Sequence, residues 1–233
     1  MILTRESSIN LQKIRSDLHE LDLETDQPNI HELEKLLTYY FECSQALNEV
    51  GTRLEILDAD YQFRYEHNPI HHMERRMKSV SSLLEKIQRK QIPFTYDAIT
   101  NTIYDIAGIR VITNYLSDVE AVASALLENQ DMTLVYRRDY ISDPKPSGYR
   151  SLHLVMQVPF TQSDGVRRAP VEIQIRTIGM DMWASLEHKL RYKSQTAPDM
   201  MAQYSERLTH YAGEIAQIES GMQGIFQALK EKH

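Results

Sequence analysis

The segment between residues 150 and 177 constrains the fold more than any other part of the chain. Its two halves, 150–159 and 168–177, alternate apolar and polar residues, and a period of two is the period of a β-strand. The halves flank Ser163-Asp164-Gly165, and an Asp-Gly pair between alternating segments is a hairpin turn signal. The sequence therefore predicts an antiparallel β-hairpin with one apolar face and one polar face.

The polar face of this hairpin carries an unusual mixture of side chains. A turn centred on Asp164-Gly165 pairs His153 with Arg176, Val155 with Gln174, and Gln157 with Glu172. This register places four different groups on one surface, namely His153, Glu172, Gln174 and Arg176. A solvated sheet face is the ordinary explanation of such a pattern. The mixture of imidazole, carboxylate, amide and guanidinium, next to a helix predicted to start at residue 178, favours a binding site instead.

Helical and strand-like segments alternate along the rest of the chain. Apolar residues that recur at steps of three and four predict helices at 1–21, 29–63, 70–90, 117–129, 178–193 and 198–230. β-Branched segments predict further strands at 109–115 and 132–140. The predicted fold class is therefore α/β (α+β), with a mixed, partly antiparallel β-sheet that is flanked by helices.

Basic residues gather on the helix predicted at 70–90. The whole chain has a net charge of −7, but residues 64–90 carry seven basic and three acidic side chains. At 100° per residue, five polar side chains fall within about 60° of one another, namely Arg75, Lys78, Ser82, Lys86 and Arg89. A solvated face would explain this stripe, whereas a triphosphate would relieve the repulsion between its cations. Arg76 is predicted on the apolar stripe, where a guanidinium either snorkels or meets a flat, partly buried group.

Two carboxylates are candidates for binding a metal ion. Asp105 stands where the chain enters a predicted strand, and Glu172 lies on the polar face of the hairpin. Mg²⁺ prefers a small number of carboxylates together with phosphate oxygens, so this pair suits a magnesium–nucleotide complex. Three histidines lack the spacing of a zinc site and are predicted to be surface residues, namely His67, His71 and His72.

The composition excludes several classes of protein. Cys43 is the only cysteine, which excludes a disulfide scaffold and a cysteine-based zinc ribbon. No apolar run approaches the roughly 18 residues that span a membrane, and the polar start Met1–Glu6 is unlike a signal peptide. There is no GxxxxGK[ST] loop and no GxGxxG motif, so a nucleotide would be bound by another scheme. We expect a cytoplasmic protein without a membrane partner.

Four sequence motifs connect the middle of the chain with a known family. They are Asp105-Ile-Ala-Gly-Ile-Arg110, Lys145-Pro-Ser-Gly-Tyr-Arg-Ser-Leu-His153, Val171-Glu-Ile-Gln-Ile-Arg-Thr177 and Trp183-Ala-Ser-Leu-Glu-His188. In this order they resemble the RelA/SpoT-type (p)ppGpp synthetase domain, and with Asn68–Arg76 the chain resembles the stand-alone small alarmone synthetases of the RelP type. The resemblance implies a nucleotidyltransferase-like synthetase domain at 65–195. It would lie between an N-terminal helical extension at 1–64 and a C-terminal oligomerisation helix at 196–233.

The resemblance also implies an activity. Synthetases of this family transfer the β,γ-pyrophosphate of ATP to the ribose 3′-hydroxyl of GTP or GDP, and they release AMP and pppGpp or ppGpp in the stringent response. Mg²⁺ is the cofactor that the resemblance implies. Long members of the family add a hydrolase domain with a His-Asp metal motif. Because the sequence contains no such motif, we expect synthesis without hydrolysis.

Position by position, the resemblance assigns roles to particular residues. Asp105 and Glu172 would bind Mg²⁺ and act in catalysis, with Glu172 drawing the proton from the 3′-hydroxyl. The ATP-binding residues would be Arg76, Lys78, Ser82, Lys86, Arg89 and Arg110, with Arg76 and Arg110 on either side of adenine. The GTP- or GDP-binding residues would be Lys145, Tyr149, His153 and Gln174, with Tyr149 stacked on guanine. The position of Asp181 is Asn in some relatives, and its role stays open.

Two other functions remain as alternatives. A pyrophosphokinase acting on tRNA would need a broad basic surface, which a net charge of −7 does not favour. A catalytically inactive regulator that binds nucleotide or RNA would have no need of Asp105 and Glu172. We expect no stable nucleic-acid partner.

The C-terminal helix carries an apolar seam. Its residues alternate steps of three and four, as in a helix that packs along another, and they are Met201, Tyr204, Leu208, Tyr211, Ile215, Ile218, Met222, Ile225 and Leu229. Packing onto the N-terminal helices of the same chain would explain this seam. Small synthetases of the family form tetramers through terminal helices, and we expect a homo-oligomer here, a tetramer.

Overall fold

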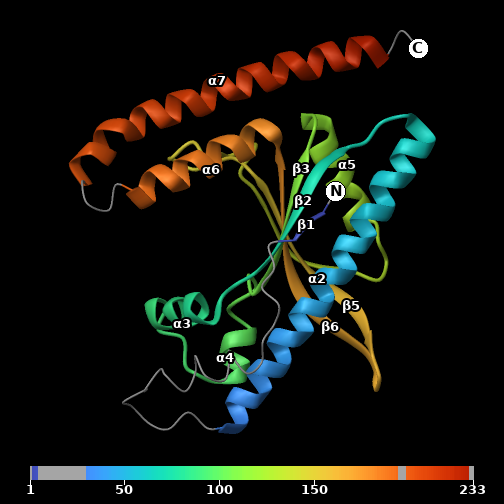
Figure 1. Cartoon of the computed structure of the whole chain (residues 1–233), viewed down its shortest axis with the longest axis vertical. Helices are drawn as coiled ribbons and strands as arrows, with labels where there is room; N and C mark the ends of the chain where they lie inside the picture. The colour runs from blue at the N-terminus through green and yellow to red at the C-terminus, as the bar shows by residue number, and fades with distance from the viewer. Residues whose placement is uncertain (1, 5–29, 194–197, 231–233) are drawn as a thin grey trace.

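Six strands and six helices make up the part of the chain that the computed structural model describes, residues 2–4, 30–193 and 198–230 (Figure 1). The strands are β1 (Ile2–Thr4), β2 (Ile70–Met77), β3 (Ala107–Thr113), β4 (Thr133–Asp139), β5 (Leu152–Gln162) and β6 (Gly165–Thr177). The helices are α2 (Ile30–Tyr65), α3 (Val80–Arg89), α4 (Tyr96–Thr100), α5 (Leu116–Leu127), α6 (Ile178–Lys193) and α7 (Pro198–Lys230). None of these helices combines the length and the apolar character that crossing a bilayer requires.

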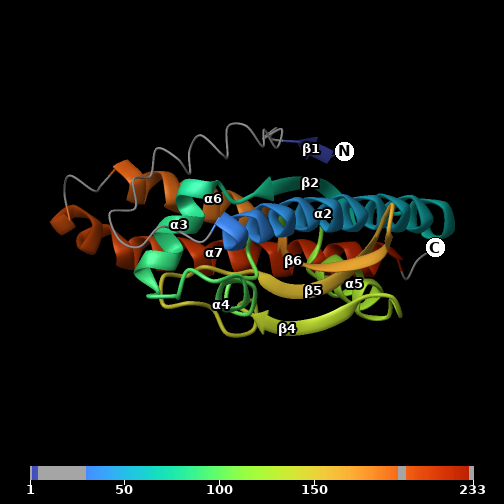
Figure 2. The same cartoon turned by 90° about the horizontal axis from the view of Figure 1, so that it is seen from below.

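The strands form one mixed sheet in the order β1-β2-β3-β6-β5-β4. β1 runs parallel to β2, and β3 runs parallel to β6, whereas the other neighbouring strands are antiparallel. Figure 2 shows β1 and β4 at opposite sides of the molecule, with β6 and β5 between them. The predicted fold class, a mixed and partly antiparallel sheet flanked by helices, is confirmed.

The core lies between α2 and one face of the sheet. α2 crosses β2, β3, β6 and β5, and its residues Cys43, Val50 and Leu54 are fully buried. Ile109 and Ile173, which are partners in the β3–β6 pair, belong to the same buried cluster. Because side chains alternate along a strand, the neighbours of these residues point to the other face of the sheet. That face carries the polar side chains.

The predicted hairpin is present, with a register that differs by two residues. His153 pairs with Gln174 and Val155 pairs with Glu172, rather than with Arg176 and Gln174 as predicted. The turn lies one residue earlier than predicted, because Gln162 already pairs with Gly165 and leaves Ser163 and Asp164 between them. A shift of two residues keeps every side chain on its predicted face, whereas a shift of one would exchange the faces.

The prediction of one helix over 70–90 was wrong. Residues Ile70–Met77 form β2, which pairs with β3, and the helix starts only at Val80. Ser79 has an extended conformation, and its side chain accepts the backbone N–H of Ser82, which is a typical N-terminal cap. Pairing with β3 therefore outweighs the helical spacing of the apolar residues before Ser79. Arg75 and Lys78 do not share a helical stripe with Lys86, and Arg76 lies on a strand.

The N-terminal helix predicted over residues 1–21 is contradicted at its start. Ile2–Thr4 form β1, which pairs with Met73–Arg75 of β2. Residues 5–21 lie outside the described residues.

The side of α7 that packs against the rest of the chain differs from the predicted apolar seam. Its inward-facing residues are Leu208, Ala212, Ile215, Glu219, Gln223 and Phe226. Several of these contacts are polar, and Gln223 Oε1 accepts the backbone N–H of Ser117 at 2.9 Å. Most of the predicted seam is exposed, namely Tyr204, Tyr211, Ile218, Met222, Ile225 and Leu229. α7 thus turns an apolar stripe away from its own chain.

Candidate active site

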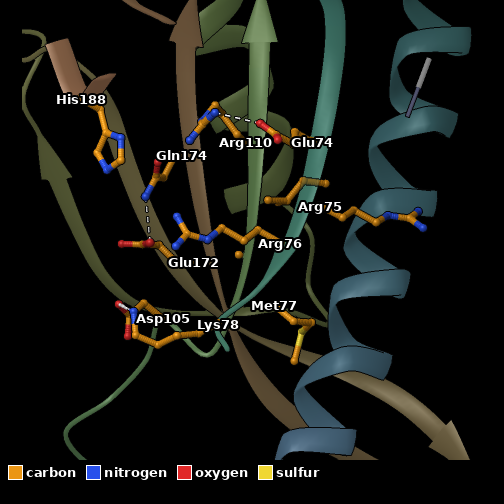
Figure 3. A pocket seen from close by; sticks show the side chains of 12 residues that line it. Glu74, Arg75, Arg76, Met77, Lys78, Asp105, Arg110, Glu172, Gln174 and His188 are labelled. Carbon is orange, nitrogen blue, oxygen red and sulfur yellow. Dashed lines mark hydrogen bonds and ion pairs between the residues drawn. The ribbon is translucent and has the colours of Figure 1, made fainter. Parts of the chain in front are cut away.

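A pocket of about 550 Å³ lies on the polar side of the sheet, over β2, β3 and β6 (Figure 3). It is lined by Glu74, Arg75, Arg76, Met77, Lys78, Asp105, Gly108, Ile109, Arg110, Glu172, Gln174 and His188. All but His188 come from the strands or the segments next to them, and His188 comes from α6. Six of the predicted site residues are among these twelve.

Strand register explains why these side chains meet. Gly108 of β3 pairs with Arg76 of β2 on one side and with Glu172 of β6 on the other. Two residues further along β3, Arg110 pairs with Gln174. Residues two apart on a strand share a face, so the four side chains project into the same space. Gly108 has no side chain, which leaves the floor between Arg76 and Glu172 open.

Asp105 is held by two lysines at the edge of the pocket. Lys78 Nζ donates to Asp105 Oδ2 at 3.0 Å, and Lys86 Nζ lies 2.7 Å from Oδ1. Burial raises the pKa of Asp105, but the two ammonium groups outweigh it, so the pKa lies below its ordinary value. Lys78 precedes α3 and Lys86 lies on it, so they meet at this carboxylate although they share no helical stripe.

Glu172 is a largely buried carboxylate with two donors around it. Gln174 Nε2 donates to Oε2 at 2.9 Å, and His153 Nδ1 lies 3.4 Å from Oε1. Burial raises the pKa of Glu172, but His153 and Gln174 outweigh it, and the pKa lies below its ordinary value. At neutral pH the group is therefore ionised and able to accept a proton. The charge of Asp105 is near enough to act on this pKa, which places the two carboxylates in one site.

Aromatic side chains border the site on the β5 side. The Tyr149 hydroxyl lies 2.8 Å from His153 Nε2, so Tyr149 connects with Glu172 through one imidazole. Lys145 Nζ lies 4.5 Å from the ring centre of Tyr140 and 4.7 Å from that of Tyr149, which are cation–π distances. This cluster offers a ring for stacking and a cation for an anionic ligand.

The loop that carries Lys145 and Tyr149 rests on α7. Gly148 has a φ of +90°, a conformation that L side chains rarely adopt. A Cβ atom at this position would lie 2.8 Å from the Cβ of Ala212 on α7. The close approach of loop and helix therefore requires glycine, and α7 supports the aromatic border of the site.

Two arginines from neighbouring strands extend into the pocket. Figure 3 shows Arg76 and Arg110 on the same side of the sheet as Gln174 and Glu172. Arg110 Nη1 donates to Glu74 Oε2 at 2.8 Å, whereas Arg76 is exposed and forms no ion pair within the part of the chain that the structure describes. Burial, and then the charge of Arg176, lowers the pKa of Arg110.

The residues of the predicted phosphate stripe differ in their position relative to the pocket. Ser82 and Arg89 are on α3 but do not line the pocket, so their contact with a ligand stays a prediction. Arg75 also borders the pocket, but Figure 3 shows its side chain directed toward α2. There its Nη1 lies 3.4 Å from Asn48 Oδ1.

Sequence reasoning missed several residues of the site. Glu74 is not predicted, because a helix over residues 70–77 gives its side chain no special position. His188 ends a family motif, and Arg176 lies on the polar face of the hairpin, but neither received a role. Asp181, whose role was open, has Oδ1 3.2 Å from Arg176 Nη1 and 3.5 Å from Arg110 Nε.

The donor set suits magnesium better than a transition metal. Among the described residues there is no cluster of three or more His, Cys, Asp and Glu side chains that could hold a metal ion. Asp105 and Glu172 are two hard carboxylates in one pocket. Mg²⁺ is commonly bound by one or two carboxylates together with substrate phosphates, so these residues fit the predicted cofactor.

Comparisons with known proteins agree with this arrangement. Residues 75–197 match the family described as "Region found in RelA / SpoT proteins". The chain is 41% identical to GTP pyrophosphokinase YwaC of Bacillus subtilis over 82% of this chain and 88% of that protein. It is 37% identical to GTP pyrophosphokinase YjbM of the same organism, over 78% and 86%. The crystal structure of small alarmone synthetase 1 from Bacillus subtilis bound to its product pppGpp superimposes with a TM-score of 0.73, at 36% identity, over 84% of this chain and 97% of that one. The chain belongs to the RelA/SpoT family.

Proposed function

We propose that this protein is a (p)ppGpp synthetase, which transfers the β,γ-pyrophosphate of ATP to the ribose 3′-hydroxyl of GTP or GDP and releases AMP. The observation that carries the proposal is the position of Glu172. This ionised carboxylate lies in one pocket with the lysine-bound Asp105, and His153 connects it with Tyr149. Two relatives named GTP pyrophosphokinase and a solved relative bound to pppGpp support the same activity.

In this proposal Glu172 accepts the proton of the 3′-hydroxyl. Its lowered pKa keeps it ionised, and the donors from Gln174 and His153 fix the direction of its oxygens. A base of low pKa is weak, so its contribution rests on position more than on basicity. Phosphoryl-type transfer requires mainly such positioning and the stabilisation of charge.

Lys78, Lys86 and the pocket arginines bind the donor nucleotide. The two lysines now neutralise Asp105, and they lie at the pocket edge where a triphosphate would bring further negative charge. When bound by Asp105 and Glu172, Mg²⁺ would supply charge neutralisation at the phosphates. Arg76 and Arg110 extend from neighbouring strands on the same face, and adenine lies between their guanidinium groups in this proposal.

The acceptor nucleotide binds at the Tyr149 loop. Guanine stacks on the ring of Tyr149, and Lys145 leaves its place between the two tyrosine rings for the acceptor phosphates. His153 and Gln174 lie between this loop and Glu172, where the ribose would be held.

Product analysis tests the proposed function. Purified protein is incubated with ATP, Mg²⁺ and either GTP or GDP, and the nucleotides are separated by anion-exchange chromatography. We expect AMP and pppGpp or ppGpp in equal amounts, with no breakdown of added pppGpp. Transfer of label from ATP to tRNA, or nucleotide binding without AMP release, would favour one of the two alternatives.

The same chain is proposed to act as a homotetramer in the cytoplasm, where ATP and GTP are available. The exposed stripe of α7 supports self-association, because Ile218, Met222, Ile225 and Leu229 are each more than half exposed. A second exposed apolar row follows α6, with Ile178, Met182, Leu186 and Leu190. Both rows are long enough to pack against a second copy.

A further inference from the structure

Arg176 is a buried cation for which the proposed chemistry has no direct use. It lies near the end of β6, and its side chain is 6% exposed. Its Nη2 donates to the Tyr149 hydroxyl at 2.6 Å and to Gln174 Oε1 at 2.9 Å. Nη1 donates to Asp181 Oδ1 at 3.2 Å, and Nε donates to Ser151 Oγ at 3.3 Å. A buried charge is costly unless its hydrogen bonds are satisfied, and here all three nitrogens have partners.

The donors of Arg176 favour one direction for a hydrogen-bond chain. A guanidinium donates and never accepts, so the Tyr149 oxygen must accept from it. The Tyr149 O–H is then free to donate to His153 Nε2, 2.8 Å away. When Nε2 accepts this hydrogen bond, the ring proton of His153 is on Nδ1, which is 3.4 Å from Glu172 Oε1. The chain therefore ends with a donor on the carboxylate.

A second chain starts at the same guanidinium and ends on the same carboxylate. Because Gln174 Oε1 accepts from Arg176, its amide nitrogen is directed to Glu172 Oε2, to which it donates at 2.9 Å. The opposite orientation of the amide would place an oxygen against an ionised carboxylate. Arg176 thus fixes the orientation of both groups that hold Glu172.

We infer that Arg176 is a positioning residue, which holds the acceptor-stacking ring of Tyr149 and the base Glu172 in register with each other. The inference rests on the proposed function, in which guanine stacks on Tyr149 and Glu172 receives the 3′-hydroxyl proton. Arg176 itself is not among the residues that line the pocket. It acts through Tyr149 and Gln174, so it influences the acceptor side and the chemical step rather than the binding of ATP.

A double-mutant cycle tests the route through Tyr149. Arg176→Lys replaces a fork of donors by a single ammonium that cannot reach all four acceptors. We expect its KM for GTP to rise about tenfold and its kcat to fall about tenfold, with the KM for ATP changed by less than about twofold. Tyr149→Phe keeps the stacking ring but removes the hydroxyl through which Arg176 reaches His153. In the Tyr149→Phe background, Arg176→Lys should raise the KM for GTP no further.

Controls separate positioning from stability. Arg137→Lys changes an arginine of β4 that pairs with Glu120, and it should leave both KM values and kcat as in the wild type. Effects of Arg176→Lys and Tyr149→Phe on the KM for GTP that multiply, or equal losses for ATP and GTP, would overturn the inference. A lower Tm with unchanged KM and kcat would also overturn it, since that is the result of a purely structural role.

Two further measurements keep the inference separate from the proposed function. GTP affinity is measured by titration calorimetry without turnover, so weaker GTP binding by Arg176→Lys is detectable even if the product is not pppGpp. A wild-type protein that releases no AMP contradicts the proposed function instead. If Arg176→Lys does not fold, Tyr149→Phe alone tests the inference. Unchanged kcat and KM in Tyr149→Phe would contradict the hydrogen-bond chain that runs through the Tyr149 hydroxyl.

Discussion

Lys86 Nζ lies 2.7 Å from Asp105 Oδ1, so the carboxylate proposed to bind magnesium is an ion-pair partner of a proposed phosphate ligand. Lys78 occupies the other oxygen of the same carboxylate at 3.0 Å. Asp105 therefore neutralises one of the two lysine charges, and the group of three keeps one net positive charge for an anionic ligand. A magnesium–ATP complex carries charges of both signs. Its metal ion can pair with Asp105 while its phosphates pair with the two lysines, so no buried charge is left unpaired.

Removing the α3 cations should weaken ATP binding selectively. Lys86→Ala and Arg89→Ala each delete a proposed charge-assisted contact with the donor phosphates, which is typically about 1.5–3 kcal/mol or roughly 10- to 100-fold in KM for ATP. The KM for GTP should change little, as steady-state kinetics with each substrate varied in turn would measure. Lys90→Ala, at the exposed C-cap of α3, is the matched control. A larger effect on GTP than on ATP would mean that the two pockets are exchanged.

Tyr149→Ala should raise the KM for GTP and leave ATP binding nearly intact. Stacking of a base on an aromatic ring is typically about 1–3 kcal/mol, which corresponds to roughly 10- to 100-fold. Tyr140→Ala is the comparison, because Tyr140 shares the contact with Lys145 but is not assigned to the guanine. Equal losses for both nucleotides in Tyr149→Ala would show a structural role for this ring.

The hairpin shows which parts of the site the sequence could predict. Faces follow from a period of two, so His153, Glu172, Gln174 and Arg176 share a surface although the predicted register differs by two residues. The exact partners depend on the position of the turn, and a Ser-Asp-Gly segment does not determine which two of its residues form it. The sequence therefore predicts which residues of the hairpin share the polar face, but it does not predict which residues pair across the two strands.

The segment before Ser79 shows where sequence patterns fail. Residues 70–77 have the spacing of an amphipathic helix, and no turn signal separates them from α3. They form a strand because β3 offers a free edge at that place, which is a tertiary effect beyond local propensity. The helical interpretation places Lys78 and Lys86 on one stripe, whereas in the structure they meet at Asp105 from the segment before α3 and from α3 itself. It could not find Glu74, whose position depends on the strand.

Self-association should depend on the outward stripe of α7. Replacing Ile218 and Ile225, which are 66% and 61% exposed, by lysine places charges in the proposed contact without touching the chain's own core. Multi-angle light scattering at micromolar concentration should give four times the chain mass of 27.2 kDa for the wild type and a lower mass for the double variant. Gln217→Lys, a neighbouring exposed position, should keep the wild-type mass. A monomeric wild type would contradict the proposed tetramer.

The lowered pKa of Glu172 predicts an acid-dependent part of stability. A carboxyl whose pKa is lower in the folded state stabilises the fold above its unfolded pKa of about 4.3, and this contribution is lost as the pH falls through the folded pKa. The difference in Tm between the wild type and Glu172→Gln should therefore be constant from about pH 8 to about pH 5 and should change at lower pH. A change in this Tm difference that begins near neutral pH would indicate that the pKa of Glu172 is raised, and would contradict the environment described for its carboxylate.

Glu172→Gln should abolish turnover while the fold and most nucleotide binding persist. The side chain lies among Gln174, His153 and the open floor above Gly108, whereas Val171 and Ile173 hold the backbone from the buried face. Glutamine has nearly the same shape but accepts no proton and is a poorer ligand for Mg²⁺. Loss of a general base typically lowers the rate by about 10²- to 10⁴-fold. AMP release from ATP and GTP, measured beside the Tm, checks this, and near-wild-type turnover in a folded variant would remove Glu172 from the mechanism.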